Sequence, residues 1–314
     1  MSWFGERTKR SWLERVGINV VKCGPIPAHI AFIMDGNRRY AKRSNSPAIE
    51  GHKMGFNRLA RTLDWCLDLG VREVTVFAFA VDNFRRPAGE VDGLMDFAGE
   101  ICKRLLARRD RLNETGKCVR VLGDLTMLRP DIQRQAADIV LATRGNGGQH
   151  SLNICFAYSS RREIAAALGD LQRCVRRGVI DVADIDSRLI AQCLYAPECS
   201  APDILVRTSG EHRLSDFLLW QTSHAVIEYV PVLWPEFTLW HLLAAVLAYQ
   251  RNCWSTVGAR QAIEGVDDVV DCEHREVRQQ RVDNCLQYIH NKRVDQLKCM
   301  AGGGDTGEVD RVVH

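Results

Sequence analysis

Short apolar runs of strand length recur along this chain, and longer stretches with a helical pattern of apolar residues lie between them. The runs cover residues 30–34, 74–79, 119–122, 152–156, 204–206 and 226–230. The first run (IAFIM) is apolar without a break, which is typical of a strand buried on both faces of a parallel sheet. The helical patterns lie at about 52–69, 90–112, 131–143 and 161–177. This alternation predicts an α/β fold, with a central mainly parallel β-sheet flanked by helices.

Three glycines mark where helical patterns are expected to end. Gly70, Gly116 and Gly178 each follow such a pattern within a few residues. Glycine is common at this position because it readily adopts the left-handed backbone conformation that ends many helices. We therefore expect a helix to stop before each of these glycines.

Composition excludes several classes of protein. The chain has 314 residues, of which 46% are hydrophobic and 26% charged, as in an ordinary globular protein. No apolar run is long enough to span a bilayer, and no secretory signal peptide is evident. The formal net charge of +3 is too small to indicate nucleic-acid binding, so no nucleic acid is expected as a partner.

The two ends of the chain differ from its centre. Residues 1–24 mix tryptophans and aliphatic residues with arginines and lysines, a pattern that favours an amphipathic helix at a membrane surface or a helix that packs on the domain. Residues 251–314 are charged and weakly periodic, which predicts a helical or flexible extension that ends in a flexible tail at 301–314. Between them, residues 25–250 form the predicted α/β domain.

The first apolar run ends in a cluster of polar residues, Asp35, Gly36, Asn37, Arg38 and Arg39. Open α/β sheets place their ligands at the carboxyl ends of the strands, where this cluster falls. A carboxylate suits Mg²⁺, and guanidinium groups recognise phosphate oxygens through paired hydrogen bonds. A solvated turn is the alternative interpretation, since Asp-Gly is a common turn pair.

Two more clusters follow other apolar runs. The second contains Asn83, Arg85 and Arg86, and the third contains Arg207, Arg213 and Ser215. Each taken alone is also compatible with an ordinary polar loop. Because the carboxyl ends of parallel strands meet at one edge of a sheet, we expect all three clusters to lie together. Arginines at two places with one carboxylate indicate an enzyme that binds two phosphorylated substrates with Mg²⁺.

At this point the sequence resembles a known family. The segments HIAFIMDGNRRYAK, EGHKMGF, FAFAVDNFRRP, RTSGEHRLSDFLLWQ and VLWPEF, in this order, are similar to motifs of the cis-prenyltransferases, which include the undecaprenyl diphosphate synthases. The resemblance covers about residues 25–250, and it is closest to the eukaryotic dehydrodolichyl diphosphate synthases. It implies an α/β catalytic domain with a central parallel sheet and a hydrophobic tunnel for the growing product.

The resemblance also implies an activity. Members of this family add isopentenyl diphosphate repeatedly to an allylic primer such as farnesyl diphosphate, with Mg²⁺, and form cis double bonds. The eukaryotic products are long-chain polyprenyl diphosphates, precursors of the dolichol used in protein glycosylation. The alternative is a catalytically silent scaffold subunit of the same complex, which would be expected to lack the acid and the arginines that this chain has.

Site residues follow from the resemblance position by position. It assigns Asp35 to Mg²⁺ on the allylic diphosphate, and Gly36, Asn37, Arg38 and Arg39 to that diphosphate. It assigns His52 to the reacting centre, Asn83 to positioning the departing proton, Arg86 to diphosphate binding, and Arg207, Arg213 and Ser215 to isopentenyl diphosphate. For His52 the alternative is a histidine at a helix start, packed against the sheet. The apolar stripe of Leu94, Met95, Phe97, Ile101 and Leu105 is assigned either to the tunnel or to the core.

Two departures from the bacterial pattern imply a partner. Bacterial homodimers have a metal-binding glutamate where this chain has Val226, and Glu228 lies two residues further on. The chain also has no R-x-G ending of the kind that completes a neighbouring active site. Both features resemble the eukaryotic subunits that pair with a Nogo-B-receptor-type subunit, so we expect a heteromer with weak or no activity alone. The same resemblance implies a peripheral position on the cytosolic face of the endoplasmic reticulum membrane.

One motif points to a different class. Residues 267–271 read DDVVD, which is the metal motif of trans-prenyltransferases. Those enzymes are all-helical and carry two such motifs on facing helices. A single copy in a polar segment is therefore interpreted as an acidic patch that arose by chance.

Overall fold

The computed structural model of the protein describes residues 2–5, 9–147, 149–264 and 272–302. The expected flexible tail at 301–314 lies outside the described residues, except for its first two positions. The DDVVD motif at 267–271 also lies outside them.

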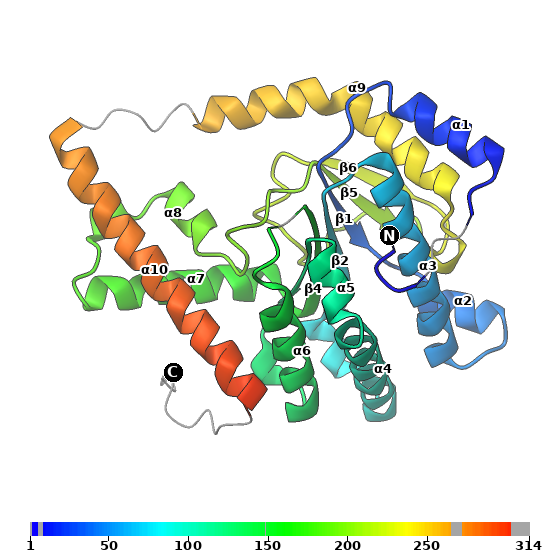
Figure 1. The fold of residues 1–314 in the computed structure, drawn as a ribbon, viewed down its shortest axis with the longest axis horizontal. Helices are drawn as coiled ribbons and strands as arrows, with labels where there is room; N and C mark the ends of the chain where they lie inside the picture. The colour runs from blue at the N-terminus through cyan, green and yellow to red at the C-terminus, as the bar shows by residue number, and fades with distance from the viewer. Residues whose placement is uncertain (1, 6–8, 148, 265–271, 303–314) are drawn as a thin grey trace.

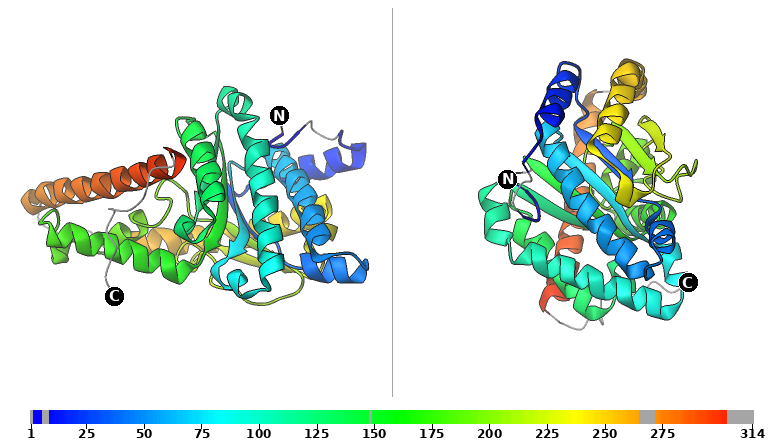
Figure 2. Two further views of the ribbon diagram at one scale, coloured as in Figure 1. Left: turned by 90° about the horizontal axis from the view of Figure 1, so that it is seen from below. Right: turned by 90° about the vertical axis from the view of Figure 1, so that its right-hand side faces the viewer.

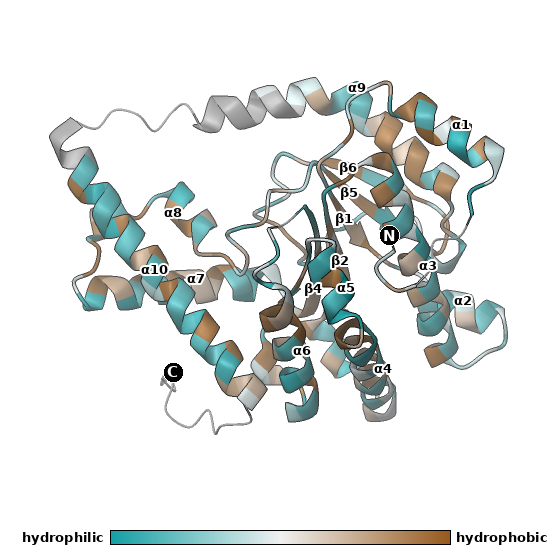
Figure 3. Ribbon diagram, viewed as in Figure 1, coloured by the Kyte–Doolittle hydropathy of each residue, from teal (hydrophilic) through white to brown (hydrophobic). Residues whose placement is uncertain are grey.

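A six-stranded sheet with every neighbouring pair parallel forms the centre of the molecule (Figure 1). Its strands are β1 (His29–Ile33), β2 (Glu73–Ala80), β3 (Lys117–Leu122), β4 (His150–Tyr158), β5 (Ile204–Thr208) and β6 (Val226–Val230). They lie in the order β3-β4-β2-β1-β5-β6. Each apolar run of the sequence falls at a strand, so the predicted parallel sheet is confirmed. Figure 3 shows the hydrophobic character of β1 and β5 inside the layers of helices.

Ten α-helices are described around this sheet. They are α1 (Trp12–Val21), α2 (Asn37–Arg43), α3 (Ala48–Leu69), α4 (Ala88–Leu106), α5 (Arg109–Glu114), α6 (Pro130–Thr143), α7 (Ser160–Arg176), α8 (Ser187–Gln192), α9 (Leu239–Glu264) and α10 (Cys272–Gly302). One face of the sheet, with Ile30 and Phe32 of β1, packs against residues of α3, α5, α6 and α9. The other face, with Ala31 and Ile33, packs against Phe217 and Leu218.

The predicted helix at 90–112 is two helices. α4 ends at Leu106, and α5 starts at Arg109 after Arg108 leaves the helical region with φ −112° and ψ 8°. The break turns the chain so that Leu112 packs into the core with β3 residues, where it is 2% exposed. The apolar spacing continued through the break, and the sequence therefore predicted one helix.

The glycines predicted at helix ends have the expected backbone. Gly70 caps α3 with φ 93°, and Gly116 and Gly178 have φ values of 61° and 68°. In each case φ lies in the left-handed region that side chains with a Cβ atom rarely adopt. The three predicted helix ends are therefore confirmed.

The C-terminal helices extend away from the sheet (Figure 1). The boundary that we expected at residue 250 falls inside α9, where the Gln250 amide donates to the carbonyl oxygens of Val21 and Pro25. Helix α10 packs against α6 and α7, and Figure 2 shows α7 and α10 on one side of the sheet. Cys174 of α7 and Cys285 of α10 belong to the small hydrophobic cluster between them.

The N-terminal segment packs on the domain and also exposes an apolar face. Ser11 and Glu14 form a capping box at the start of α1, and α1 lies against α9. At Gly17 the helices approach so closely that a Cβ atom would lie 2.9 Å from Cζ3 of Trp240. On the outer side, Trp12 and Val16 are at least half exposed. Within the described part of the chain, no helix is both long and apolar enough to cross a membrane.

Candidate active site

The strand ends bring the three predicted clusters together. Asp35 follows β1, Asn83 lies in the 3₁₀ turn after β2 (Val81–Arg85), and Arg207 is in β5, paired in register with Ile33 of β1. A cavity of about 1120 Å³ opens at this edge of the sheet. Its lining contains Asp35, Gly36, Asn37, Arg38, Arg39, His52, Asn83, Arg86, Arg207, Arg213 and Ser215. Of the residues in the three predicted clusters, only Arg85 does not line this cavity: its side chain is exposed and pairs with Asp82.

Arg207 is the buried centre of one half of the site. Its Nη2 atom lies 2.8 Å from Oδ2 of Asp35, and its Nη1 atom donates to Oγ of Ser215 at 2.8 Å. Nη1 also donates to the backbone carbonyl oxygen of Arg213. The Thr208 hydroxyl bonds the backbone N–H and carbonyl of Asp35, at 3.0 and 2.8 Å. These contacts fix the carboxylate and the guanidinium before a substrate arrives.

The loop after β1 is shaped by glycines. Gly36 has φ 105°, a value that strains any residue with a Cβ atom, and it lies against Leu233. In α3, a Cβ on Gly51 would lie 2.2 Å from the Asn37 carbonyl oxygen, and one on Gly55 would lie 2.3 Å from Asn37 Oδ1. The start of α2 can therefore approach α3 only because both positions are glycine.

Glu90 joins two arginines on another side of the cavity. Its Oε1 atom lies 3.1 Å from Nη1 of Arg86 and 3.8 Å from Nε of Arg38. Nearby, Asn83 Oδ1 accepts from the backbone N–H of Ala80 at 3.1 Å, which fixes the turn after β2.

His52 is neutral in this cluster. Burial is the main reason that the pKa of His52 is lowered to about 4; Arg86 and Arg38 contribute to this lowering, and Glu90 opposes it. Its Nε2 atom is buried and has no hydrogen-bond partner within the protein. A neutral imidazole with a free ring nitrogen therefore lines the cavity.

The loop after β5 has a strained backbone and contributes the carboxylate of Glu211 to the cavity. Ser209, Ser215, Asp216 and Leu218 have φ values of 84°, 52°, 60° and 46°. Such conformations cluster at functional sites when the surrounding structure enforces them. Here Asp216 accepts from the backbone N–H of Arg161 at 3.1 Å. Glu211 lies 3.3 Å from Nη2 of Arg39 and also pairs with Arg213.

Sequence reasoning missed Glu90 and Glu211. Glu211 lies inside the quoted motif RTSGEHRLSDFLLWQ and Glu90 lies three residues after FAFAVDNFRRP, but a glutamate near arginines is also typical of a solvated loop. Glu228, two residues after Val226, lies on the edge strand β6. Neither Glu228 nor Val226 lines the cavity.

The far part of the cavity is apolar. Leu59, Phe79, Leu94, Phe97, Ile101 and Phe156 line it. The predicted stripe of α4 is therefore divided: Leu94, Phe97 and Ile101 face the cavity, whereas Met95 and Leu105 are core residues, 2% and 0% exposed. A cavity lined by arginines and by apolar side chains fits an amphipathic molecule with an anionic head.

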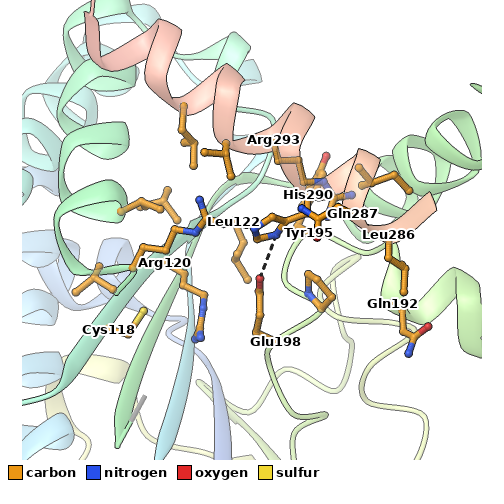
Figure 4. Close-up of a pocket in the computed structure, with 18 of the residues that line it drawn as sticks. Cys118, Arg120, Leu122, Gln192, Tyr195, Glu198, Leu286, Gln287, His290 and Arg293 are labelled. Carbon is orange, nitrogen blue, oxygen red and sulfur yellow. Dashed lines mark hydrogen bonds and ion pairs between the residues drawn. The ribbon is translucent and has the colours of Figure 1, made fainter. Parts of the chain in front are cut away.

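A second cavity, of about 680 Å³, lies between β3, α6, α10 and residues 192–198 (Figure 4). Its charged side chains have partners within the protein. Arg293 donates to the carbonyl oxygens of Cys193 and Leu194, and His290 lies 3.9 Å from Glu198. None of the predicted site residues lines it.

A metal ion would find one protein carboxylate at the strand-end cluster. In the described ranges, no group of three or more His, Cys, Asp or Glu side chains could hold a metal. Mg²⁺ is often bound through one or two carboxylates, substrate phosphates and water. Asp35 lines the cavity among the arginines, so it fits an ion that binds together with a diphosphate.

Fold and site together define an α/β protein whose cavity, at the carboxyl edge of its sheet, suits an apolar molecule with a polyanionic head. Residues 33–255 match the family described as putative undecaprenyl diphosphate synthase. The human dehydrodolichyl diphosphate synthase complex subunit is 52% identical over 327 aligned residues, which cover 95% of this chain and 98% of that protein. The tritrans,polycis-undecaprenyl-diphosphate synthase of Pyrococcus abyssi is 38% identical, covering 76% and 90%.

A solved structure agrees with these relatives. Lavandulyl diphosphate synthase from Lavandula x intermedia, in complex with dimethylallyl diphosphate, superposes with a TM-score of 0.67 at 28% identity. The alignment covers 72% of this chain and 95% of the plant enzyme. The chain therefore belongs to the cis-prenyltransferase family, and the resemblance read from its motifs is confirmed.

Proposed function

We propose that this chain is the catalytic subunit of a dehydrodolichyl diphosphate synthase. It condenses isopentenyl diphosphate in sequence onto farnesyl diphosphate and gives a long-chain cis-polyprenyl diphosphate, the precursor of dolichol. The observation that carries this proposal is the single cavity in which a carboxylate and five arginines from three strand ends meet an apolar interior. The human relative, which aligns along almost its whole length, is named for the same synthase.

The allylic diphosphate occupies the loop after β1. Gly36 and Asn37 offer backbone groups at close approach, and Arg38 and Arg39 offer guanidinium groups. Asp35 would hold Mg²⁺, which when bound neutralises charge on the departing diphosphate. The arginines stabilise the same charge as the allylic C–O bond breaks and its electron pair leaves with the diphosphate.

Isopentenyl diphosphate occupies the neighbouring position, held by Arg86, Arg207, Arg213 and Ser215. Its double bond attacks the allylic carbon, a C–C bond forms, and a proton leaves the isopentenyl unit to complete the new alkene. Asn83 and His52 line the same cavity, and we assign them to positioning at the reacting centre. Holding both substrates side by side supplies a large effective concentration. The growing chain extends into the apolar interior as a product tunnel.

The partner and the location belong to the same proposal. The bacterial glutamate is replaced by Val226, and the human relative is named as a subunit of a complex, which supports pairing with a Nogo-B-receptor-type subunit. Exposed tryptophans on α1 and α9, Trp12 at 66% and Trp254 at 78%, support peripheral binding to the cytosolic face of the endoplasmic reticulum membrane. The N-terminal segment, the catalytic domain and the C-terminal extension remain the proposed divisions of the chain.

Asp35→Ala tests the enzymatic role against a silent scaffold. Removing the carboxylate takes away the Mg²⁺ ligand and the partner of Arg207, so polyprenyl synthesis should fall by about 10³-fold or more. Circular dichroism should show the same fold as the wild type. Normal turnover by the folded variant would overturn the assignment.

A further inference from the structure

Glu90 occupies a position between two guanidinium groups that the proposed function assigns to diphosphate binding. Arg38 comes from α2, Arg86 follows the turn after β2, and Glu90 stands in the first turn of α4. The same oxygen atom, Oε1 of Glu90, faces both arginines, at 3.1 Å to Arg86 and 3.8 Å to Arg38. One carboxylate thus connects three separate elements at the mouth of the cavity.

The surroundings of Glu90 explain why a negative charge is needed there. Arg86 and Glu90 are largely buried, with side chains 22% and 20% exposed. Burial lowers the pKa of Arg86 and the positive charge of Arg38 lowers it too, whereas Glu90 opposes both by favouring the charged form. Without a carboxylate between them, the two guanidinium groups would repel each other. Arg38 could then turn toward solvent, since its side chain is already 59% exposed.

We propose that Glu90 is a positioning residue, which fixes the separation and orientation of Arg38 and Arg86 for the two diphosphates of the condensation. The inference rests on the proposed function, since it takes those arginines as diphosphate ligands. Glu90 is not placed in contact with the reacting atoms; it acts through the two guanidinium groups. It also lowers the positive potential of the cavity mouth, because its charge opposes theirs.

These two effects have opposite consequences for binding and for turnover. In Glu90→Gln the negative charge disappears, so a diphosphate meets a more positive site and binds more tightly. The arginines lose the negative charge that orients them, because the amide of glutamine is a weaker partner than a carboxylate, so the reacting groups are held less accurately and turnover slows. A purely structural glutamate would not separate these quantities, because loss of local structure weakens binding and turnover together.

The test measures inorganic diphosphate binding by calorimetry and steady-state condensation, with the full chain in its complex where turnover requires the partner. Glu90→Gln should lower the Kd for diphosphate by about 3-fold to 10-fold and lower kcat by about 10-fold or more. Glu90→Asp keeps the charge but withdraws it by one methylene, so its Kd should stay near wild type while kcat falls. Asp92→Asn removes an equal charge from an exposed position two residues further along α4 and should change neither quantity.

The outcomes distinguish failure of the positioning role of Glu90 from failure of the proposed function. If wild type binds diphosphate and turns over, but Glu90→Gln matches it in both Kd and kcat, the positioning role is overturned. The same holds if Glu90→Gln weakens diphosphate binding and turnover in parallel. If wild type neither binds diphosphate nor makes product, the proposed function itself fails, and the role of Glu90 fails with it. If Asp92→Asn changes Kd and kcat as much as Glu90→Gln does, the loss of one negative charge explains both results, and the inference is also overturned.

Discussion

Arg207 shows how much of the site depends on the geometry of one side chain. Its guanidinium is almost completely buried, and it reaches the Asp35 carboxylate, the Ser215 hydroxyl and the Arg213 carbonyl at once. Only a planar group with several N–H donors can serve partners in such different directions. A lysine at this position would keep the charge but not the contacts.

Arg207→Lys should therefore lower kcat/KM by about 100-fold and the free energy of unfolding by about 1–3 kcal/mol, because buried polar partners lose their hydrogen bonds. Steady-state kinetics and denaturant unfolding measure both effects. Arg213→Lys is the matched control for stability, since that side chain is 60% exposed and should change the unfolding free energy by less than about 0.5 kcal/mol. Equal losses of stability in the two variants would contradict this account of Arg207.

His52 makes the stability of the folded protein depend on pH. Its pKa is about 4 in the folded chain, below the ordinary value of 6.5 that it regains on unfolding. Burial also lowers the pKa of His29, which bonds Thr75 and the Ser200 carbonyl. Between pH 6.5 and 4 the unfolded chain therefore binds more protons, and stability must fall as the pH falls.

Each of these histidines should reduce the free energy of unfolding by up to about 1.4 kcal/mol per pH unit below pH 6.5. Denaturant titrations at pH 7, 6 and 5 measure this slope, above the range in which most carboxylates titrate. His52→Asn should flatten the slope in part and leave the contribution of His29. An unchanged slope in the variant would show that His52 does not remain neutral in the folded protein.

The elements at the site depend on glycine at a helix contact. Gly51 and Gly55 let α3 accept the start of α2, and Gly36 makes the turn between β1 and α2. Together they hold Asn37 and the arginines of α2 at the end of β1. A methyl group at Gly51 would meet the backbone of Asn37, and one at Gly55 would meet the side chains of Asn37 and Trp234, so either would displace the start of α2.

Gly55→Ala should thus raise the KM for the allylic substrate by about 10-fold or more and lower the unfolding free energy by about 1–3 kcal/mol. Gly93→Ala in α4 is the control, because a Cβ there meets no atom within 4 Å and alanine favours the helix. The control should keep its KM and gain up to about 1 kcal/mol. A normal KM in Gly55→Ala would contradict the close contact of α2 and α3.

The strands could be predicted from the sequence, and several helices could not. Continuous apolar runs such as residues 30–34 identify strands buried on both faces, and the glycines identify helix ends. The break at Arg108 left no signal, since the apolar spacing continued to Leu112. Helix α9 was missed before residue 250, because apolar residues such as Trp240 and Leu247 are exposed on it and obscure its periodicity.

The candidate site was predictable to the extent that its residues lie in motifs at strand ends. Asp35 and Arg207 follow buried strands, and parallel topology alone brings them to one edge. The roles of Glu90 and Glu211 were not predictable, because each also pairs with an arginine of α2, Arg38 or Arg39, that is distant in the sequence. His52 was placed at the site by resemblance alone, and its neutral state follows only from its surroundings.

At the scale of the whole molecule, α1 and α9 form an exposed apolar surface. The surface consists of Trp12, Leu13, Val16 and Val20 of α1 and Trp240, Leu247 and Trp254 of α9. The two helices lie side by side, and Lys22 and Arg251 are exposed on them. Tryptophans with basic neighbours are typical of proteins that bind the interface of an anionic bilayer.

Replacing Trp12 and Trp254 by serine should lower binding to vesicles of phosphatidylcholine and phosphatidylserine by about 10-fold or more in a flotation assay. Val182→Ser is the control, because Val182 is 71% exposed and lies outside the α1 and α9 surface. The fold should be unaffected in both proteins. Unchanged vesicle binding by the tryptophan variant would exclude this surface as the membrane contact.

The most direct test of the account is incorporation of labelled isopentenyl diphosphate into long-chain polyprenyl product, with farnesyl diphosphate and Mg²⁺. The full chain is assayed alone and together with a Nogo-B-receptor-type subunit. The account predicts long cis-polyprenyl diphosphate with the partner present, and little or none with the chain alone. Absence of product in both assays, with the protein folded and the complex formed, would contradict the assignment of this chain as the catalytic subunit.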